Sequence, residues 1–272
     1  MVSTTIARTD DGTIQINFSI PKIEVDKAQE KAIADLSKDM TVKGFRKGKA
    51  PIEKVKERID PGKLLEKTLG QILPDAYTKA LTENKIRPII YPKFEIMKQG
   101  DTWEIQAKIA ELPLVEVGNY TDLIKSAFKT LKKDATKQEK EDLVIRTLLD
   151  SIKIKLPKIL TDEEVNARLS QLLERTEKLG LKLEQYLQSI GKTEQSLREE
   201  YDKQVDEGIS VELILNKIAE LEKVQPDEKD VDTAIKQAGI MEDHVGHVEE
   251  QKVMVRAVLK RRIVLDRLSS LN

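Results

Sequence analysis

The chain has 272 residues, of which 39% are hydrophobic and 35% are charged, and its formal net charge is −1. This length allows one large domain or two ordinary ones, and the high charged fraction favours long, solvated helices. Aromatic residues make up only 4%, which argues against wide aromatic-lined ligand pockets, and the lack of cysteine excludes disulfides and thiolate metal sites.

The charge is unevenly distributed along the chain. Residues 38–58 carry eight basic and three acidic side chains, whereas residues 113–272 carry 27 basic and 31 acidic ones. One basic region in a weakly acidic chain argues against a general nucleic-acid-binding protein but allows one polyanionic docking point. The sequence has no run of 18 apolar residues, and its N-terminus lacks the order of a secretory signal. We therefore expect a cytoplasmic protein without a membrane segment.

The chain begins with the pattern of a β-hairpin. The stretches TTIAR and TIQINFSI alternate apolar and polar residues, and DDG between them is a turn signal. Asp26 and Gln29 match a capping box, which predicts a helix that starts there and continues to Met40. This helix leads into the basic region.

Two more helices and two more strands are predicted before residue 112. Pro51 suits the first turn of a short helix, and apolar periodicity from Leu65 to Ala80 predicts a longer one that Pro74 kinks or splits. The stretches KFEIMK and TWEIQAKIAE then read as strands around a QGD turn. The first region is therefore α+β, with Trp103 in its core.

Pro113 marks a boundary, and from about residue 137 the pattern is almost purely helical. The capping box Thr161–Glu164 predicts the start of one helix, and Thr193 the start of a helix of about 30 residues. Such long helices suggest an all-α, extended, arm-like domain with apolar grooves. The chain as a whole should be mainly helical.

The stretch GFRKGKAP, residues 44–51, sets an aromatic and several basic side chains between two glycines and a proline. The glycines permit a tight backbone, an aromatic on such a loop gains little from burial, and arginine binds phosphate or carboxylate in a bidentate manner. This pattern suits docking on a protein or RNA surface, and it suits a solvated turn equally well. The candidate binding residues are Gly44, Phe45, Arg46, Lys47, Gly48 and Lys49.

This motif, between a hairpin with its helix and a second helix, resembles the ribosome-docking signature of the trigger factor family of bacterial ribosome-associated chaperones. The resemblance continues through LGQILPDAYTKAL and TWEIQAKIAELPLVEV. A second block, LVIRTLLDSIKIKLPKILTDEEVNARL with GISVELILNKIAELEKV, resembles the helical, substrate-cradling domain of that family. By this resemblance, Phe45, Arg46 and Lys47 would be the tripeptide that docks at the ribosomal tunnel exit.

The resemblance implies a ribosome-binding domain at residues 1–118, a short linker at 119–136 and a substrate-cradling domain at 137–272. Family members usually carry an FKBP-like prolyl isomerase domain between the two blocks, and that domain needs several strands and an aromatic-lined pocket. The intervening NYTDLIKSAFKTLKKDATKQ is too short and holds one Tyr and one Phe. We therefore expect no isomerase domain, no catalytic residues, no cofactor and no enzymatic activity.

The implied function is that of an ATP-independent molecular chaperone. Its partners would be the large ribosomal subunit, through a tunnel-exit ribosomal protein and rRNA, and nascent or unfolded polypeptides; a weak homodimer is compatible with the sequence. Apolar positions of the long helices could face clients or form the helix–helix core, and periodicity does not separate the two roles. The candidate client-binding residues are Leu169, Leu172, Leu173, Ile209, Leu213 and Ile218.

Two other classes of function remain open. One is an off-ribosome chaperone or assembly factor, and the other is a ribosome- or RNA-binding factor without chaperone activity. His244 and His247 stand three residues apart among carboxylates, a spacing that would suit a metal ion on a helix face. Gly246 between them and the lack of an accompanying motif favour two polar surface histidines, so no metal site is expected.

Overall fold

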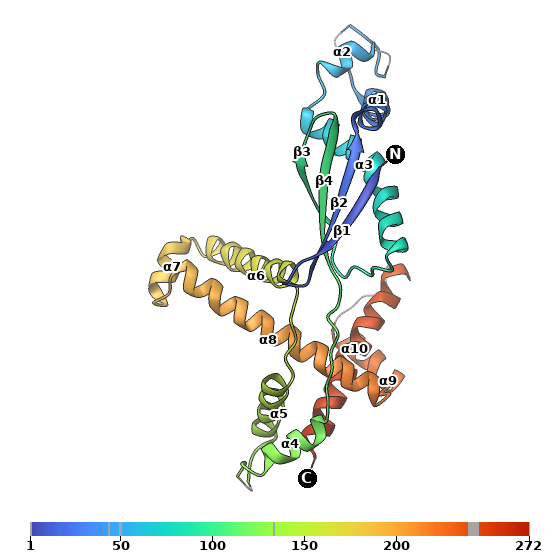
Figure 1. Ribbon diagram of the computed structural model, residues 1–272. Coiled ribbons are helices and arrows are strands. Elements are labelled where there is room, and N and C mark those ends of the chain that lie inside the picture. The colour runs from blue at the N-terminus through green and yellow to red at the C-terminus, as the bar shows by residue number, and fades with distance from the viewer. Residues whose placement is uncertain (1, 43, 49–50, 133, 239–244, 272) are drawn as a thin grey trace. The chain divides into compact units, whose positions relative to one another are not determined.

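The computed structural model describes residues 2–42, 44–48, 51–132, 134–238 and 245–271. The chain divides into two compact units, drawn in Figure 1. The N-terminal unit comprises Met1–Leu112 and Pro157–Leu160, and the helical unit comprises Pro113–Leu156 and Thr161–Asn272. The first unit contains a sheet with helices, and the described residues of the second form helices without strands, which confirms the predicted α+β and all-α regions.

The sheet of the N-terminal unit has four antiparallel strands in the order β1-β2-β4-β3 (Figure 1). On one face, alternate apolar side chains of the central strand β2 are almost completely buried, whereas on the other face Gln106 of β4 donates hydrogen bonds to Gln15 and Asn17. This period of two is the pattern that predicted the strands. The strands are β1 (Ser3–Arg8), β2 (Thr13–Pro21), β3 (Lys93–Lys98) and β4 (Thr102–Ala110).

Three helices complete the N-terminal unit: α1 (Lys22–Asp39), α2 (Ile52–Lys56) and α3 (Pro61–Glu83). Helix α3 packs Leu73 and Ala80 against the apolar face of the sheet, in one cluster with the buried side chains of β2. A second cluster joins α1, the following loop, α2 and the start of α3. Its buried members are Ala32, Ile33, Val42, Val55 and Leu64.

Two predicted helix starts are wrong. Helix α1 begins at Lys22 rather than at the capping box Asp26–Gln29, and α6 begins at Lys158 rather than at Thr161–Glu164. Both helices begin directly after a proline, whose fixed φ already suits a helix entry upstream of the matching side chains. The predicted start at Thr193 is confirmed, because its hydroxyl accepts a hydrogen bond from the Ser196 backbone N–H.

Pro74 does not split α3, which continues from Pro61 to Glu83 with the proline inside. The helix is well capped at its start, where the Asp60 carboxylate accepts a hydrogen bond from the Lys63 backbone N–H at 2.9 Å. A proline in a helix interior forfeits one backbone hydrogen bond. Burial of Leu73 and Ala80 against the sheet offsets that loss.

The described part of the helical unit consists of seven helices. Its core joins α4, α5, α8 and α10 through fully buried side chains, among them Ile124, Leu148, Ile214 and Val264. Figure 1 shows α6 and α8 as two arms that meet at α7. The helices are α4 (Tyr120–Phe128), α5 (Lys137–Ser151), α6 (Lys158–Lys178), α7 (Leu183–Ser189), α8 (Glu194–Leu221), α9 (Glu228–Gln237) and α10 (Val245–Ser269).

The segment 119–136 contains helix α4, which the weak periodicity of that stretch did not reveal. Ile124 of this helix is fully buried in the core of the helical unit. The Tyr120 hydroxyl donates a hydrogen bond to Glu222, 2.9 Å away, and burial together with this carboxylate raises the pKa of Tyr120 to about 12. Nine residues of this segment therefore form part of the packed helical unit.

A cluster of four charged side chains joins α5 to α10. Glu141, whose side chain is only 9% exposed, accepts two hydrogen bonds from the Arg262 guanidinium, at 2.8 and 3.2 Å. Lys137 lies 3.7 Å from Glu141 and 2.7 Å from Asp266, which also pairs with Arg262 at 3.2 Å. The two anions and two cations of this ionic cluster compensate one another at the edge of the apolar core.

The ionic cluster makes the acid stability of the helical unit depend on Asp266. Its hydrogen bond with Lys137 and the nearby charge of Arg262 lower the pKa of Asp266 below its ordinary value of 3.8. Because the folded-state pKa is the lower one, the stabilisation is present above pH 3.8 and disappears as the pH falls through the folded-state value. We expect thermal melting of Asp266→Asn to depend less on pH below about pH 4 than melting of the unchanged protein. If the melting temperatures of both proteins depended equally on pH in this range, the role assigned to Asp266 would be wrong.

Candidate functional site

The loop that follows α1 is held in place by backbone hydrogen bonds and by one buried side chain. The Phe45 N–H donates to the Val42 carbonyl at 3.0 Å, and the Gly48 N–H donates to the Met40 carbonyl at 3.2 Å. The Val42 side chain is 4% exposed and belongs to the second core cluster of the N-terminal unit. The described part of the loop is therefore an ordered turn that presents the three side chains between its two glycines.

Both glycines of the loop adopt positive φ angles, +92° at Gly44 and +72° at Gly48, which other residues adopt only with strain. At Gly48 there is a second constraint. A Cβ atom there would lie 2.9 Å from the Lys38 carbonyl oxygen at the end of α1, a contact too close for real structures. The backbone of this turn thus requires glycine for its conformation and, at Gly48, also for its packing.

The three side chains between the glycines face solvent. Phe45 is 43% exposed, although most aromatic side chains in the protein are more buried, and Arg46 is exposed. Lys47 is also exposed, and its ammonium lies 3.3 Å from the carboxylate of Asp39 at the end of α1. Within the described ranges Arg46 has no ion-pair partner. One turn therefore exposes an apolar ring together with a guanidinium that has no ion-pair partner among the described residues.

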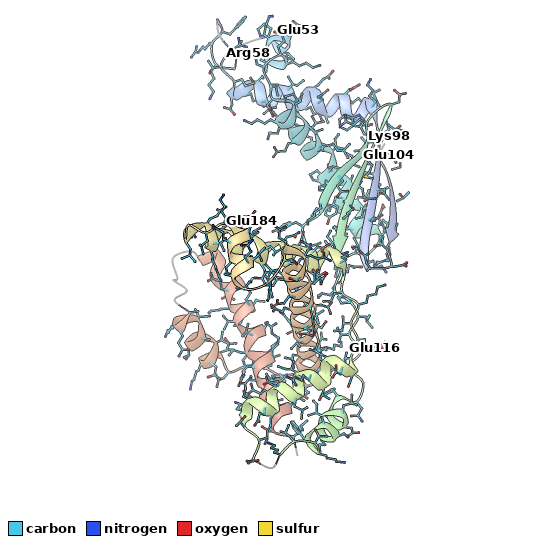
Figure 2. All side chains as sticks on the ribbon, turned by 90° about the vertical axis from the view of Figure 1, so that its left-hand side faces the viewer. Glu53, Arg58, Lys98, Glu104, Glu116 and Glu184 are labelled. Atoms are coloured by element: carbon cyan, nitrogen blue, oxygen red, sulfur yellow. The ribbon has the colours of Figure 1, made fainter. Side chains whose placement is uncertain are left out.

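The surroundings of the loop carry further charge. Helix α2 and the turn after it hold Lys54, which pairs with Glu57 at 3.3 Å, and Arg58. Figure 2 shows Glu53 and Arg58 projecting outward at this end of the N-terminal unit. Lys49, the sixth predicted binding residue, lies outside the described residues.

The six candidate client-binding residues divide into two groups. Leu169, Leu172, Ile209 and Leu213 are partly exposed, and Leu173 is 41% exposed, so all five could contact a partner. Ile218 is wrongly placed in the list, because it has no exposed surface and packs in the core of the helical unit. The apolar periodicity that singled out Ile218 reflects its place in the helix–helix core. This is one of the two roles that periodicity alone did not separate.

The structure exposes other large apolar side chains of the helical unit that the sequence did not single out. Three of them lie around α7, namely Leu179 (74% exposed), Leu181 (42%) and Ile190 (39%). Val253 and Met254 of α10 are 62% and 70% exposed. Leu179, Leu181 and Ile190 lie in loops or at a helix end, where apolar periodicity gives no signal. Val253 and Met254 lie inside α10, where periodicity does not separate exposed from buried positions.

Among the residues that the structure describes, no group of three potential ligands is arranged to hold a metal ion, whereas His244 and the side chain of His247 lie outside that part of the chain. No helix in the described ranges is long and apolar enough to cross a membrane.

Two family models match the chain. The model described as "Bacterial trigger factor protein (TF)" matches residues 2–143, and the model for the C-terminus of the same protein matches residues 119–270. Each match spans more than half of the chain. They overlap at residues 119–143, so no stretch of the chain lies between them.

Several curated relatives are similar over part of their length. The trigger factor of Lactococcus lactis subsp. cremoris (strain MG1363) is 29% identical over 177 residues, 64% of this chain and 35% of the relative. The trigger factor of Enterococcus faecalis (strain ATCC 700802 / V583) is 30% identical over 176 residues, 64% of this chain and 34% of the relative. The matched region thus corresponds to about a third of the length of these relatives.

A solved structure described as "Promiscuous Substrate Recognition in Folding and Assembly Activities of the Trigger Factor Chaperone" has the same fold. It aligns with a TM-score of 0.67 over 99% of this chain and 100% of that chain, at 12% sequence identity. The likeness of fold agrees with the two family matches. The chain therefore belongs to the trigger factor family.

Proposed function

We propose that this protein is an ATP-independent cytoplasmic chaperone that docks near the ribosomal tunnel exit and shields apolar segments of nascent or unfolded chains. The observation that carries the proposal is the presentation of Phe45 and Arg46 on an ordered, glycine-bounded turn. Membership of the trigger factor family supports the same role. The large ribosomal subunit, through protein and rRNA at the exit, is the proposed docking partner.

The turn at residues 44–48, named the docking turn from here on, combines two kinds of contact. Phe45 supplies an apolar anchor, and central aromatic anchors contribute strongly to protein interfaces. Arg46 offers a forked donor for a carboxylate or a phosphate, and Lys47 adds a point charge that Asp39 partly neutralises. An ordered backbone reduces the entropy lost on binding, so the turn is suited to insertion into a preformed surface.

The helical unit is the proposed client-binding part. Its exposed aliphatic side chains, such as Leu173, Leu179 and Met254, can cover apolar client segments of any sequence, because the hydrophobic effect is non-directional. The sequence-based division into a ribosome-binding domain at 1–118, a linker at 119–136 and a cradling domain at 137–272 belongs to this proposal, with helix α4 of the linker packed into the helical unit. So does the lack of prolyl isomerase activity.

Aggregation of an unfolded client should be suppressed by the full chain at near-stoichiometric ratio without added nucleotide. Affinity should be modest, on the order of micromolar, because a disordered client loses conformational entropy when it is held. Light scattering of a client diluted from denaturant measures the effect. Leu179→Ser with Met254→Ser should weaken suppression, whereas Gln171→Ser with Lys203→Ser, two exposed polar positions, should not.

Two measurements together separate the alternatives. An off-ribosome chaperone would suppress aggregation but would not co-sediment with ribosomes. A ribosome- or RNA-binding factor would co-sediment and leave client aggregation unchanged. Failure in both assays would contradict the proposed function.

A further inference from the structure

Sulfur in this chain is confined to methionine. The sequence contains five methionines and no cysteine, so no thiolate competes with them for an oxidant. Met1 and Met241 lie outside the described residues, which leaves Met40, Met97 and Met254. Because oxidation depends on access to the sulfur atom, the surroundings of these three side chains decide which of them react.

The three methionines differ in exposure. Met254 of α10 is 70% exposed and Met97 of β3 is 59% exposed. Met40, at the end of α1, is partly buried and packs against the second core cluster of the N-terminal unit. In the folded protein a small oxidant therefore has access to Met254 and Met97, and Met40 serves as an internal reference for a shielded sulfur.

Met254 lies among other exposed apolar side chains of α10. Val253 and Val258 are 62% and 55% exposed, and Val258 follows Met254 by about one helical turn, so these two side chains share a face of the helix. Residues two apart on a helix point about 200° apart, and Arg256 pairs with Glu228 of α9 at 2.9 Å. Helix α9 is therefore contacted from the other side of α10, and Met254 is on the open side.

We propose that Met254 is an oxidation site at which a peroxide lowers client binding by the helical unit. This inference rests on the proposed chaperone function, because Met254 belongs to the proposed client-binding surface. The thioether sulfur attacks one oxygen of hydrogen peroxide, and the O–O bond breaks as the S–O bond forms. The hydroxide that leaves takes the remaining hydroxyl proton and becomes water. The sulfur loses two electrons, and the peroxide gains them.

The product replaces a flexible apolar side chain with a polar sulfoxide. Thioether side chains adapt to apolar partners of many shapes, whereas covering a sulfoxide oxygen with an apolar client segment forfeits its hydrogen bonds to water. Met254 is not a member of the core cluster of the helical unit, so its oxidation should weaken client binding without unfolding the unit. Methionine sulfoxide reductases, with a dithiol as electron donor, return the thioether and make the change reversible.

Oxidation rates test the site. The full chain is treated with hydrogen peroxide, and the oxygen gained by each methionine is followed over time by peptide mass spectrometry. Met254 and Met97 should react about tenfold or more faster than Met40 in the folded protein, and the three rates should converge in denaturant. If Met40 reacted as fast as Met254 in the folded protein, the inference would be overturned.

Suppression of client aggregation tests the consequence. After oxidation, the unchanged protein and Met97→Leu should need about threefold more chaperone for the same suppression, because Met97 lies outside the helical unit. Met254→Leu should change little on oxidation, relative to its own suppression before treatment. Methionine sulfoxide reductases A and B with dithiothreitol should restore suppression by the oxidised unchanged protein.

The outcomes separate this inference from the proposed function. Equal losses in Met254→Leu and Met97→Leu, or a loss of helical circular dichroism on oxidation, would overturn the role of Met254 while chaperone activity before oxidation stands. If the untreated protein suppresses no aggregation, the proposed function fails, and control of client binding through Met254 fails with it.

Discussion

Ribosome co-sedimentation should be lost when Phe45, Arg46 and Lys47 are replaced together by alanine. The triple variant removes the apolar anchor, the free guanidinium and one ammonium of the docking turn. Loss of a central anchor alone costs about 2 kcal/mol or more, which corresponds to roughly a thirtyfold weaker affinity. The fold should persist, because exposed substitutions of this kind usually change stability by about 0.5 kcal/mol or less.

A neighbouring triple variant controls for the loss of general charge and apolar surface. Ile52→Ala, Lys54→Ala and Arg58→Ala also remove one exposed apolar side chain, since Ile52 is 59% exposed, and two basic ones from the same end of the unit. This control should retain most of the ribosome binding. Equal loss in both variants, with unchanged circular dichroism melting, would mean that overall charge rather than the turn supports docking.

The conformation of the turn can be tested without changing its binding side chains. Gly48→Ala would place a Cβ atom 2.9 Å from the Lys38 carbonyl oxygen, so the turn would have to shift. Ribosome binding should therefore weaken while Phe45, Arg46 and Lys47 remain present.

Binding of the unchanged protein should also decrease as salt rises, though less steeply than for a protein with many phosphate contacts.

Arg262→Met should destabilise the helical unit by about 2–3 kcal/mol, which is seen as a clear decrease in Tm. The methionine keeps much of the aliphatic stem, but the Glu141 carboxylate, 9% exposed, then retains only Lys137 at 3.7 Å. A buried charge without a close partner costs more than the pair contributes when intact. Because Arg262 is half-exposed, the expected loss of stability is smaller than for a fully buried ion pair.

Two further variants make this second prediction specific. Lys137→Met should have a smaller effect, because Lys137 is 64% exposed and contacts Glu141 at longer range. Glu141→Met combined with Arg262→Met should recover much of the loss, since no unpaired charge remains in the core. Similar melting temperatures for Arg262→Met and Lys137→Met would contradict the role assigned to the buried carboxylate.

Local patterns in the sequence were sufficient for the strands, the glycine-bounded turn at residues 44–48 and most helices. Alternation in TIQINFSI and TWEIQAKIAE predicts the central strands, and GFRKGKAP places a turn between its glycines. These features depend on residues close together in the chain, because strand alternation, capping and positive φ are local properties. The resemblance to the trigger factor family also depends on such contiguous stretches.

Other features were decided by contacts between residues far apart in the chain. Ile218 and Leu213 are both apolar positions of α8, yet only the packing of α4, α5 and α10 around that helix determines that Ile218 is fully buried and Leu213 is not. The Glu141–Arg262 pair joins residues 121 positions apart, and the position of β3 at an edge of the sheet follows from the strand order. Hydrophobic periodicity identifies which face of an element is apolar, but burial requires the partner that covers this face, and the tertiary structure alone supplies it.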